Sequence, residues 1–568
     1  MKFVSLIFVF AVIASLRVQA QVTNEVTPPS WSLTAKSEVA PIVLPAIDVD
    51  KLLLEDEQSS NNIAKPLRIG EAIEVNIDLY NAGAWTVLEN GDRIWRQSIV
   101  SRGAKFMKAT LDLYSLPQGA ELFLYNDSRT DKIGPYTARE NQENGVLGTW
   151  IVEGDHLWIE YYEPAAVSGF GRVSIDAITH GYVELPKQEN FGKLNESGNC
   201  NVDVLCDPNA GSTGDKDWDD ARDKYINSVA RIIYNLNGST FTCTGSMIAN
   251  TGDDTTPYFL TANHCLGDVN NGAGSSYDAS DWAFGFQWFT NTPDCATTAP
   301  TQGPQQPTRV LTGAALKANN DNSDMALFLL SQEPEEDWNI FYAGWDHSGD
   351  VPQEQLGIHH PGFDIMKLAR NDQPAESVLL NFNGNSRTQV WQIADWDYGV
   401  TEGGSSGSFI LNENDQIVGQ LAGGFAACSG TNDNNDADFY GKFDVSWDFG
   451  SRSSQRLRDW LDPEDTGVEA LDGSFFKDLE DEMQPPPPPP PNPEFDIFVF
   501  PNPSSGRYFV VSEEPTTYEI FNLNGQLIVE GSTNDLNDVI DISYAAKGIY
   551  IARVKNAGNT IVRKLIKQ

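Results

Sequence analysis

Apolar and polar positions alternate along much of the chain. Period-two alternation runs through residues 72–79, 121–125 and 156–161, with Gly and Asn between the runs. Successive side chains of a strand point to opposite faces of a sheet, so this pattern predicts half-buried β-strands. We expect an antiparallel β-sandwich here, in which His156 and His180 are structural or solvent-facing rather than catalytic.

A second sandwich is predicted near the other end. Residues 485–491 are an unbroken proline run, which predicts an extended, semi-rigid spacer and marks a domain boundary. Short β runs follow at 508–511, 518–521, 526–529 and 549–554, joined by Gly-containing turns. The sequence therefore predicts an all-β protein with a sandwich at each end.

The first residues have the pattern of a secretory signal peptide. Lys2 precedes an apolar run over residues 3–16, and Val18-Gln19-Ala20 predicts cleavage after Ala20. A membrane anchor is the alternative, but Arg17 and Gln19 end the run before the ~20 apolar residues that a spanning helix needs. No later stretch is long and apolar enough, so we expect no membrane span.

Composition narrows the possible functions. The chain has 568 residues and a formal net charge of −42, which would repel phosphate backbones, so nucleic acid is not an expected partner. All six cysteines lie in the central region, and an even count in an exported chain favours three disulfides, with fifteen connectivities open. No C-x-x-C pair supports a zinc site, so we expect no metal, although acidic loops leave calcium open.

Three central segments together supply a base, an orienting carboxylate and a nucleophile. His264 follows the apolar strand 259–262, and imidazole exchanges protons near neutral pH. Asp324 opens the apolar run 325–330; such a residue is usually a turn residue, but it can also hold an imidazole. Ser406 lies among glycines that would expose its hydroxyl and aim the N–H groups of Gly404 and Ser406 at an oxyanion. The paired His359 and His360 suggest a metal site, but neighbours on a strand face opposite ways, so we interpret them as structural.

The order His, Asp, Ser is that of the chymotrypsin-like proteases, and residues 197–463 resemble a bacterial lysyl endopeptidase. The shared motifs include Gly-Asn-Cys-Asn-Val-Asp-Val-Leu-Cys at 198–206, Phe-Leu-Thr-Ala at 259–262 before His264-Cys265, and Gly-Ser-Ser-Gly-Ser at 404–408. The resemblance implies a chymotrypsin-like double β-barrel with the catalytic residues His264, Asp324 and Ser406. It also implies the disulfides Cys200–Cys428, Cys206–Cys295 and Cys243–Cys265.

The specificity pocket differs from that of trypsin. Trypsin-like enzymes place an acidic residue six positions before the nucleophile, where this chain has Val400. The resemblance implies instead that Asp438 binds the lysine ammonium, with Gly423 and Gly424 lining the groove; a solvated acidic loop is the alternative. The family's histidine after Gly-Gln-Leu is replaced by Ala422, which leaves a broader preference for Lys or Arg open.

Processing and export complete the predicted organisation. Residues 21–193 resemble the pro-region of these enzymes, and Lys193 is the expected cleavage point. Residues from 500 onward, including Asn-Leu-Asn-Gly at 522–525, resemble the C-terminal sorting domain of the Por (type IX) secretion system, with an adhesive or carbohydrate-binding sandwich as the alternative. The predicted parts are a signal peptide (1–20), a β-rich propeptide (21–193), a protease domain (194–470), a Pro-rich linker (471–494) and a sorting domain (495–568).

We therefore expect a secreted or surface-located serine endopeptidase, exported through the periplasm, that cleaves after lysine through an acyl-enzyme. The expected partners are protein or peptide substrates and the type IX secretion machinery, and we expect a monomer that needs no cofactor. Two alternatives stay open: a broader Lys/Arg endopeptidase, and an inert binding protein on the protease fold.

Overall fold

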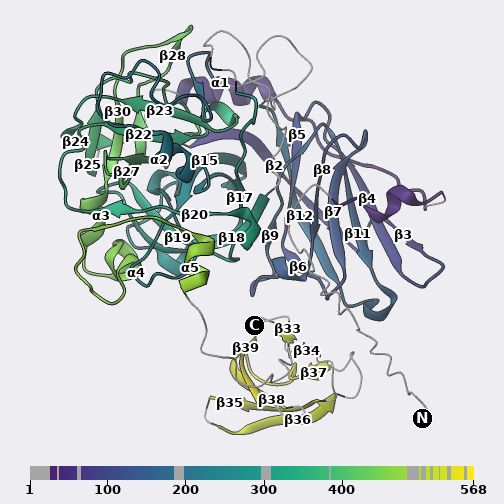
Figure 1. Cartoon of the computed structure of the whole chain (residues 1–568). Helices are drawn as coiled ribbons and strands as arrows, with labels where there is room; N and C mark the ends of the chain where they lie inside the picture. The colour runs from purple at the N-terminus through teal and green to yellow at the C-terminus, as the bar shows by residue number, and fades with distance from the viewer. Residues whose placement is uncertain are drawn as a thin grey trace, which may run out of the picture.

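The computed structural model describes most of the chain (Figure 1). The described residues are 26–34, 37–59, 66–183, 197–293, 295, 307, 309–382, 386–482, 498–500, 504, 507–511, 516–523, 525–533, 539–555 and 560–567. The predicted cleavage points after Ala20 and Lys193 and the proline run lie outside these residues.

The N-terminal domain is a β-sandwich of two sheets, with the helix α1 (Val49–Ser59). One sheet contains β1 (Ile42–Val43), β3 (Ala84–Val87), β4 (Arg93–Val100), β7 (Glu121–Asn126), β8 (Lys132–Tyr136) and β11 (His156–Glu163). The other contains β2 (Leu67–Asp78), β5 (Phe106–Leu111), β6 (Leu113–Ser115), β9 (Leu147–Gly148), β10 (Val152–Glu153) and β12 (Arg172–Gly181). Their apolar faces enclose one core that includes Trp95, Leu124 and Tyr161.

The first half of the central region is a closed barrel. Its strands are β14 (Val229–Leu236), β15 (Ser239–Met247), β16 (Tyr258–Ala262), β17 (Asp278–Phe286), β18 (Arg309–Asn320) and β19 (Met325–Leu330). They pair in the order β15-β14-β17-β18-β19-β16, and β16 returns to pair with β15. The barrel therefore brings the loops after β16 and before β19 to neighbouring positions.

The second half is a ten-stranded sheet with short helices. Its strands are β13 (Val202–Asp203), β21 (Trp345–Asp346), β22 (Gln355–His359), β23 (Lys367–Asn371), β24 (Glu376–Phe382), β25 (Ser386–Ile393), β26 (Phe409–Leu411), β27 (Ile417–Gly424), β30 (Asp438–Lys442) and β31 (Ala470–Leu471). Smaller elements are β20 (Phe341–Tyr342), β28 (Cys428–Ser429), β29 (Asn432–Asp433), β32 (Ser474–Phe475), α2 (Asp219–Tyr225), α3 (Phe443–Asp448), α4 (Arg458–Leu461) and α5 (Phe476–Glu482).

The C-terminal domain has two small sheets. One contains β33 (Phe498–Phe500), β34 (Arg507–Val511) and β37 (Val539–Asp541), and the other contains β35 (Thr516–Asn522), β36 (Leu527–Thr533), β38 (Gly548–Lys555) and β39 (Thr560–Lys567). Tyr508, Ile520 and Leu565 form part of their shared core. The all-β fold with a sandwich at each end is confirmed.

One sheet crosses the boundary between the N-terminal domain and the barrel. β2 pairs with β12 on one side and with β15 on the other, so a twelve-stranded sheet joins the two domains. Sequence alternation predicts β2 but not this second partner, because alternation identifies the buried face of a strand and not its neighbours.

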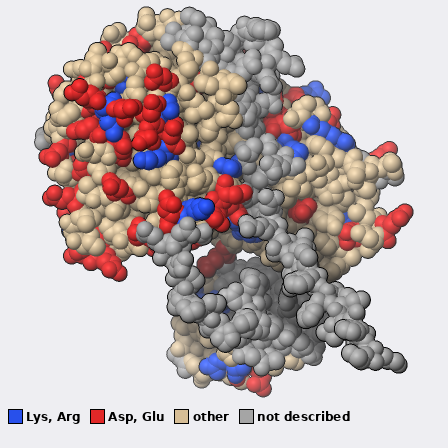
Figure 2. All heavy atoms as spheres, viewed as in Figure 1, with Lys and Arg blue, Asp and Glu red and all other residues tan. Residues whose placement is uncertain are grey.

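On the face drawn in Figure 2, Asp and Glu form several clusters on the protease part, in keeping with the net charge of −42. None of the helices in the described ranges is long and apolar enough to cross a membrane.

Candidate active site

His264 and Asp324 of the barrel are joined by two hydrogen bonds. His264 lies in a short 3-10 helix (Asn263–Leu266) directly after β16, and Asp324 directly precedes β19, the strand beside β16. The backbone N–H of His264 donates to Asp324 Oδ1 at 2.8 Å, and ring Nδ1 lies 2.6 Å from Oδ2. Asp324 adopts a positive φ of 54° to make both contacts, a strained backbone that costs of order 1–3 kcal/mol.

The surroundings of this pair fix its proton arrangement. Burial raises the pKa of the Asp324 carboxyl, while its hydrogen bonds with the His264 ring and backbone oppose that rise. A carboxylate held against Nδ1 keeps the proton there and leaves Nε2 as the proton acceptor. Nε2 of His264 is buried and has no hydrogen-bond partner among the described residues.

Glycines place the Ser406 loop against the same two strands. Gly404 and Gly407 have φ values of +96° and +81°, which favour glycine. A Cβ on Gly407 would lie 2.1 Å from Thr261 Oγ1 and 2.7 Å from the Ala262 backbone N, so the chain beside Ser406 touches the end of β16. The Thr244 N–H also donates to the Ser406 carbonyl at 2.8 Å. Ser406 thus lies next to the strand that leads into His264.

The Ser406 loop leaves two N–H groups free for a ligand. In the part of the chain that the structure describes, the backbone N–H groups of Gly404 and Ser406 donate to no acceptor. Ser405 braces the loop, because its hydroxyl bonds His359 Nδ1 at 2.8 Å and its N–H donates to the Glu402 carbonyl at 3.0 Å. Two free, fixed donors beside a nucleophile can stabilise an oxyanion.

His359 and His360 are both buried in the second half of the protease part. Burial lowers the pKa of His359 to about 3, so its ring is neutral. Nδ1 of His360 lies 3.1 Å from the Asp364 carbonyl. These contacts support a structural role, as do the hydrogen bonds of His156 to Ser98 and of His180 to Ser101 in the N-terminal sandwich.

Asp438 is a buried carboxylate near the Ser406 loop. It begins β30 and pairs with Gly424 at the end of β27. Its Oδ2 accepts hydrogen bonds from Thr401 Oγ1 at 2.6 Å and Trp396 Nε1 at 2.8 Å, and burial raises its pKa to about 6. A Cβ on Gly424 would lie only 1.8 Å from Oδ1, so a side chain there would displace the carboxylate. Asp436 in the same loop is exposed.

Two residues outside the predicted site, Gln420 and Trp396, support it through hydrogen bonds. The Gln420 amide Nε2 donates to the backbone carbonyls of Ser323 and Asp324 across the two halves of the protease part. Trp396 holds Asp438 as described above. The Gly-Gln-Leu motif at 419–421 was the available signal for Gln420; nothing in the sequence pattern signals Trp396.

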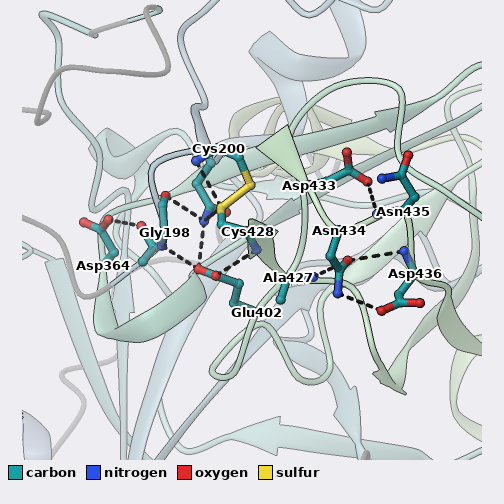
Figure 3. The surroundings of a disulfide bond; sticks show 12 residues. Gly198, Cys200, Asp364, Glu402, Ala427, Cys428, Asp433, Asn434, Asn435 and Asp436 are labelled. Carbon is teal, nitrogen blue, oxygen red and sulfur yellow. Dashed lines mark hydrogen bonds between the residues drawn. A yellow bond between two sulfur atoms is a disulfide. The ribbon is translucent and has the colours of Figure 1, made fainter. Parts of the chain in front are cut away.

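The three disulfides that the resemblance implies are present: Cys200–Cys428, Cys206–Cys295 and Cys243–Cys265. Figure 3 shows the first, where Glu402 accepts from the N–H groups of Gly198 (2.7 Å) and Cys428 (3.3 Å). This ties the segment after residue 196 to the chain that leads to Ser406. Cys243 and Cys265 also lie beside His264, but their sulfurs are bonded to each other, so this cluster is not a metal site.

The all-β fold with its closed barrel, and the pairing of His264 with Asp324 beside the Ser406 loop, are those of a chymotrypsin-like serine endopeptidase. Residues 194–441 match the family model of the lysyl endopeptidase C-terminal domain, and residues 43–182 match that of the lysyl endopeptidase N-terminal domain. The chain belongs to the lysyl endopeptidase family.

Individual relatives give further likenesses. The lysyl endopeptidase of Pseudomonas aeruginosa is 28% identical over 398 residues, which cover 66% of this chain and 80% of that protein. Among solved structures, the protease Anisep from Arthrobacter nicotinovorans is 15% identical with a TM-score of 0.26, over 39% of this chain and 91% of that one. The active form of the Rv3671c protease from M. tuberculosis is also 15% identical, with a TM-score of 0.25, over 39% and 78% of the two chains.

Residues 498–568 match the secretion system C-terminal sorting domain. The protein is therefore exported through the periplasm by the type IX secretion machinery to the cell surface or the medium.

Proposed function

We propose that this secreted endopeptidase hydrolyses peptide bonds on the carboxyl side of lysine through an acyl-enzyme. The observation that carries the specificity is the buried carboxylate of Asp438, fixed beside Gly424 by Thr401 and Trp396. A buried carboxylate is costly unless it is paired, and a substrate ammonium would pair with it. The name of the Pseudomonas aeruginosa relative agrees with this choice.

In the proposed mechanism, His264 Nε2 takes the proton of the Ser406 hydroxyl as Ser406 Oγ bonds the substrate carbonyl carbon. The N–H groups of Gly404 and Ser406 hold the resulting oxyanion, and Asp324 stabilises the charged imidazole. His264 then protonates the leaving amine as the peptide C–N bond breaks. Water, deprotonated by His264, attacks the acyl-enzyme and releases the new carboxylate and Ser406.

The geometry of Asp438 favours lysine over arginine. Thr401 and Trp396 already donate to Oδ2, and the Ala426 backbone N–H also bonds the carboxylate, so a substrate cation can use only part of its acceptor capacity. A compact ammonium is satisfied by a point contact, whereas a guanidinium pairs best with both carboxylate oxygens at once.

The test is to digest a denatured protein and identify the new carboxyl termini. We expect cuts after lysine, and a fall in kcat/KM for lysyl substrates of roughly 10²–10³ in Asp438→Asn from loss of the charge-assisted contact. Asp436→Asn, an exposed carboxylate of the same loop, is the control. Equal cutting after Lys and Arg would support the broader specificity, and cuts after Glu would refute the assignment of Asp438.

The proposed catalytic role of Ser406 has a separate test. A fluorescent organophosphate should label the processed wild-type protein but not Ser406→Ala. Absence of labelling in the wild type would point to an inert binding protein.

We also propose that residues 21–193 are a propeptide that the enzyme removes by cutting after Lys193, and that the signal peptide ends at Ala20. A lysine at this point suits the proposed specificity, and the contacts of Gly198 with Glu402 keep the segment that follows on the protease. The mature N-terminus should begin at residue 194, and Ser406→Ala should accumulate as the unprocessed chain. Normal processing of Ser406→Ala would exclude self-cleavage.

A further inference from the structure

The N-terminal domain reaches the catalytic loop through the first residues of β2. Leu67 pairs with Thr242 and Arg68 with Phe241 of β15. The Leu67 methyl groups lie 3.6 Å from the positions that Cβ atoms on Gly403 and Gly404 would occupy. A propeptide side chain therefore packs on the loop that carries the proposed oxyanion donors.

β2 runs along β15 away from the Ser406 loop. β2 is antiparallel to β15, so it starts at Thr242, next to the Cys243–Cys265 disulfide that adjoins His264, and runs away towards Ser239. In the proposed function the lysine side of a substrate lies near Asp438 and Gly424, on the other half of the protease. A substrate whose residues after the cut bond cross to the barrel half would run beside β15, as β2 does.

The N-terminal domain is held in this position by more than one strand pair. The buried Lys108 Nζ lies 3.8 Å from Asp281 Oδ2 of the barrel, and Thr179 and Thr240 share a 2.8 Å hydrogen bond. The rings of Phe106 and Phe363 lie 5.2 Å apart. Such an interface can keep β2 on the catalytic loop after a single cut in the chain.

We propose that β2 acts as a substrate-like inhibitory strand, which occupies the leaving side of the active site with Pro66 and Leu67 until the propeptide is removed. This inference rests on the proposed cleavage after lysine. The residue before Pro66 is Lys65, which lies outside the described residues and enters only through its chemistry. A bond between lysine and proline is a tertiary amide that lacks an N–H, so it resists cleavage where an ordinary lysyl amide would be cut.

The main test replaces Pro66 by alanine in the full chain. The expected result is a new cut between residues 65 and 66, found by mass spectrometry and N-terminal sequencing and absent from the wild type. Lys65→Gln/Pro66→Ala is the matched control, because it has the same ordinary amide but no lysine and should not be cut there.

A second measurement does not depend on cutting at residue 65. A lysyl-peptide phosphonate probe is added to the wild type and to Leu67→Ala, and the unprocessed and mature chains are separated on a gel. Labelling of the unprocessed chain should rise at least tenfold in Leu67→Ala. Glu71→Ala, which loses the 2.8 Å contact with Ser239 farther along the same strand, should show no such rise.

The outcomes separate this inference from the proposed function. The mature wild-type enzyme can cut after lysine while Pro66→Ala is not cut at residue 65 and Leu67→Ala is labelled no faster. That result refutes the inhibitory role of β2 and leaves the proposed specificity intact. If the mature wild type does not cut after lysine, the proposed specificity fails. Equal increases in Leu67→Ala and Glu71→Ala would indicate general loosening of the interface and would also refute the specific role of Leu67.

Discussion

Gln420 Nε2 lies 2.6 Å from the Ser323 carbonyl oxygen and 3.2 Å from that of Asp324, so a residue of β27 holds the loop that orients His264. Gln420 is fully buried, as is Ser323. A Cβ on Gly441, in the neighbouring strand, would lie 1.7 Å from the Ser323 carbonyl oxygen. The two halves of the protease part thus meet tightly behind the Asp324 carboxylate.

Gln420→Met should therefore lower kcat more than it changes KM. Methionine keeps the volume but leaves two buried carbonyls without this donor, at a cost of about 1–3 kcal/mol. We expect kcat to fall roughly 10-fold or more as Asp324 loses its support. Steady-state kinetics with a lysyl peptide measures the changes in kcat and KM separately. A rise in KM with constant kcat would contradict a positioning role.

Asp324→Asn should retain the fold and lose nearly all activity. An asparagine can occupy the same space but cannot hold His264 with Nε2 as the free acceptor, so kcat should fall roughly 10⁴-fold. Because the members of such a unit act together, Asp324→Asn/Ser406→Ala should be no worse than Ser406→Ala alone. If the two losses of kcat were additive in the double variant, Asp324 and Ser406 would not act together in catalysis.

Lysine recognition should weaken as the pH falls through about 6. Burial raises the pKa of Asp438 to about 6, and only the ionised carboxylate attracts the ammonium, so KM for lysyl peptides should rise below that pH. Since Asp438 binds its proton more tightly in the folded state, its stabilising contribution is full at low pH and is lost as the pH rises through about 6. Asp438→Asn at pH 8 should thus be at least as stable to heat as the wild type while binding lysine poorly. A KM for lysyl peptides that does not change between pH 5 and 8 would contradict the role of Asp438 in binding lysine.

Gly407→Ala should abolish activity, because the new methyl group would overlap Thr261 Oγ1 and the Thr244 carbonyl and would need a φ of +81°. A left-handed backbone alone costs about 1–2 kcal/mol for a residue with a side chain. Gly403→Ala is the matched control in the same loop, since its Cβ would contact only Leu67 at 3.6 Å. Mature Gly403→Ala should keep activity within a few-fold; equal loss in both variants would show that the loop tolerates no added methyl group.

Removal of the residues after Pro491 should leave the protease in the periplasm, because the sorting domain at 498–568 would be missing. Cell fractionation with activity measurements checks this. Undiminished export of the truncated chain would show that the sorting signal lies elsewhere in the chain.

The sequence was informative wherever chemistry is encoded locally. Alternation predicted strands such as β7 and β11, and the motif resemblance predicted the family and the three disulfides. The glycines around Ser406 predicted an exposed hydroxyl, but Ser406 is buried in the folded chain. These features depend on side-chain periodicity and on backbone conformations that glycine alone adopts easily, and both can be seen in neighbouring residues.

Only the tertiary structure decided which distant groups meet. The pairing of β2 with β15, the contact of Leu67 with the Ser406 loop, and the support of Asp324 by Gln420 join residues far apart in the chain. Strand edges present the same backbone N–H and C=O groups whatever their side chains, so partner choice depends on the packing of whole domains. The amino acids thus determined which reactive groups the protein carries, and the folded chain determined which of them lie side by side.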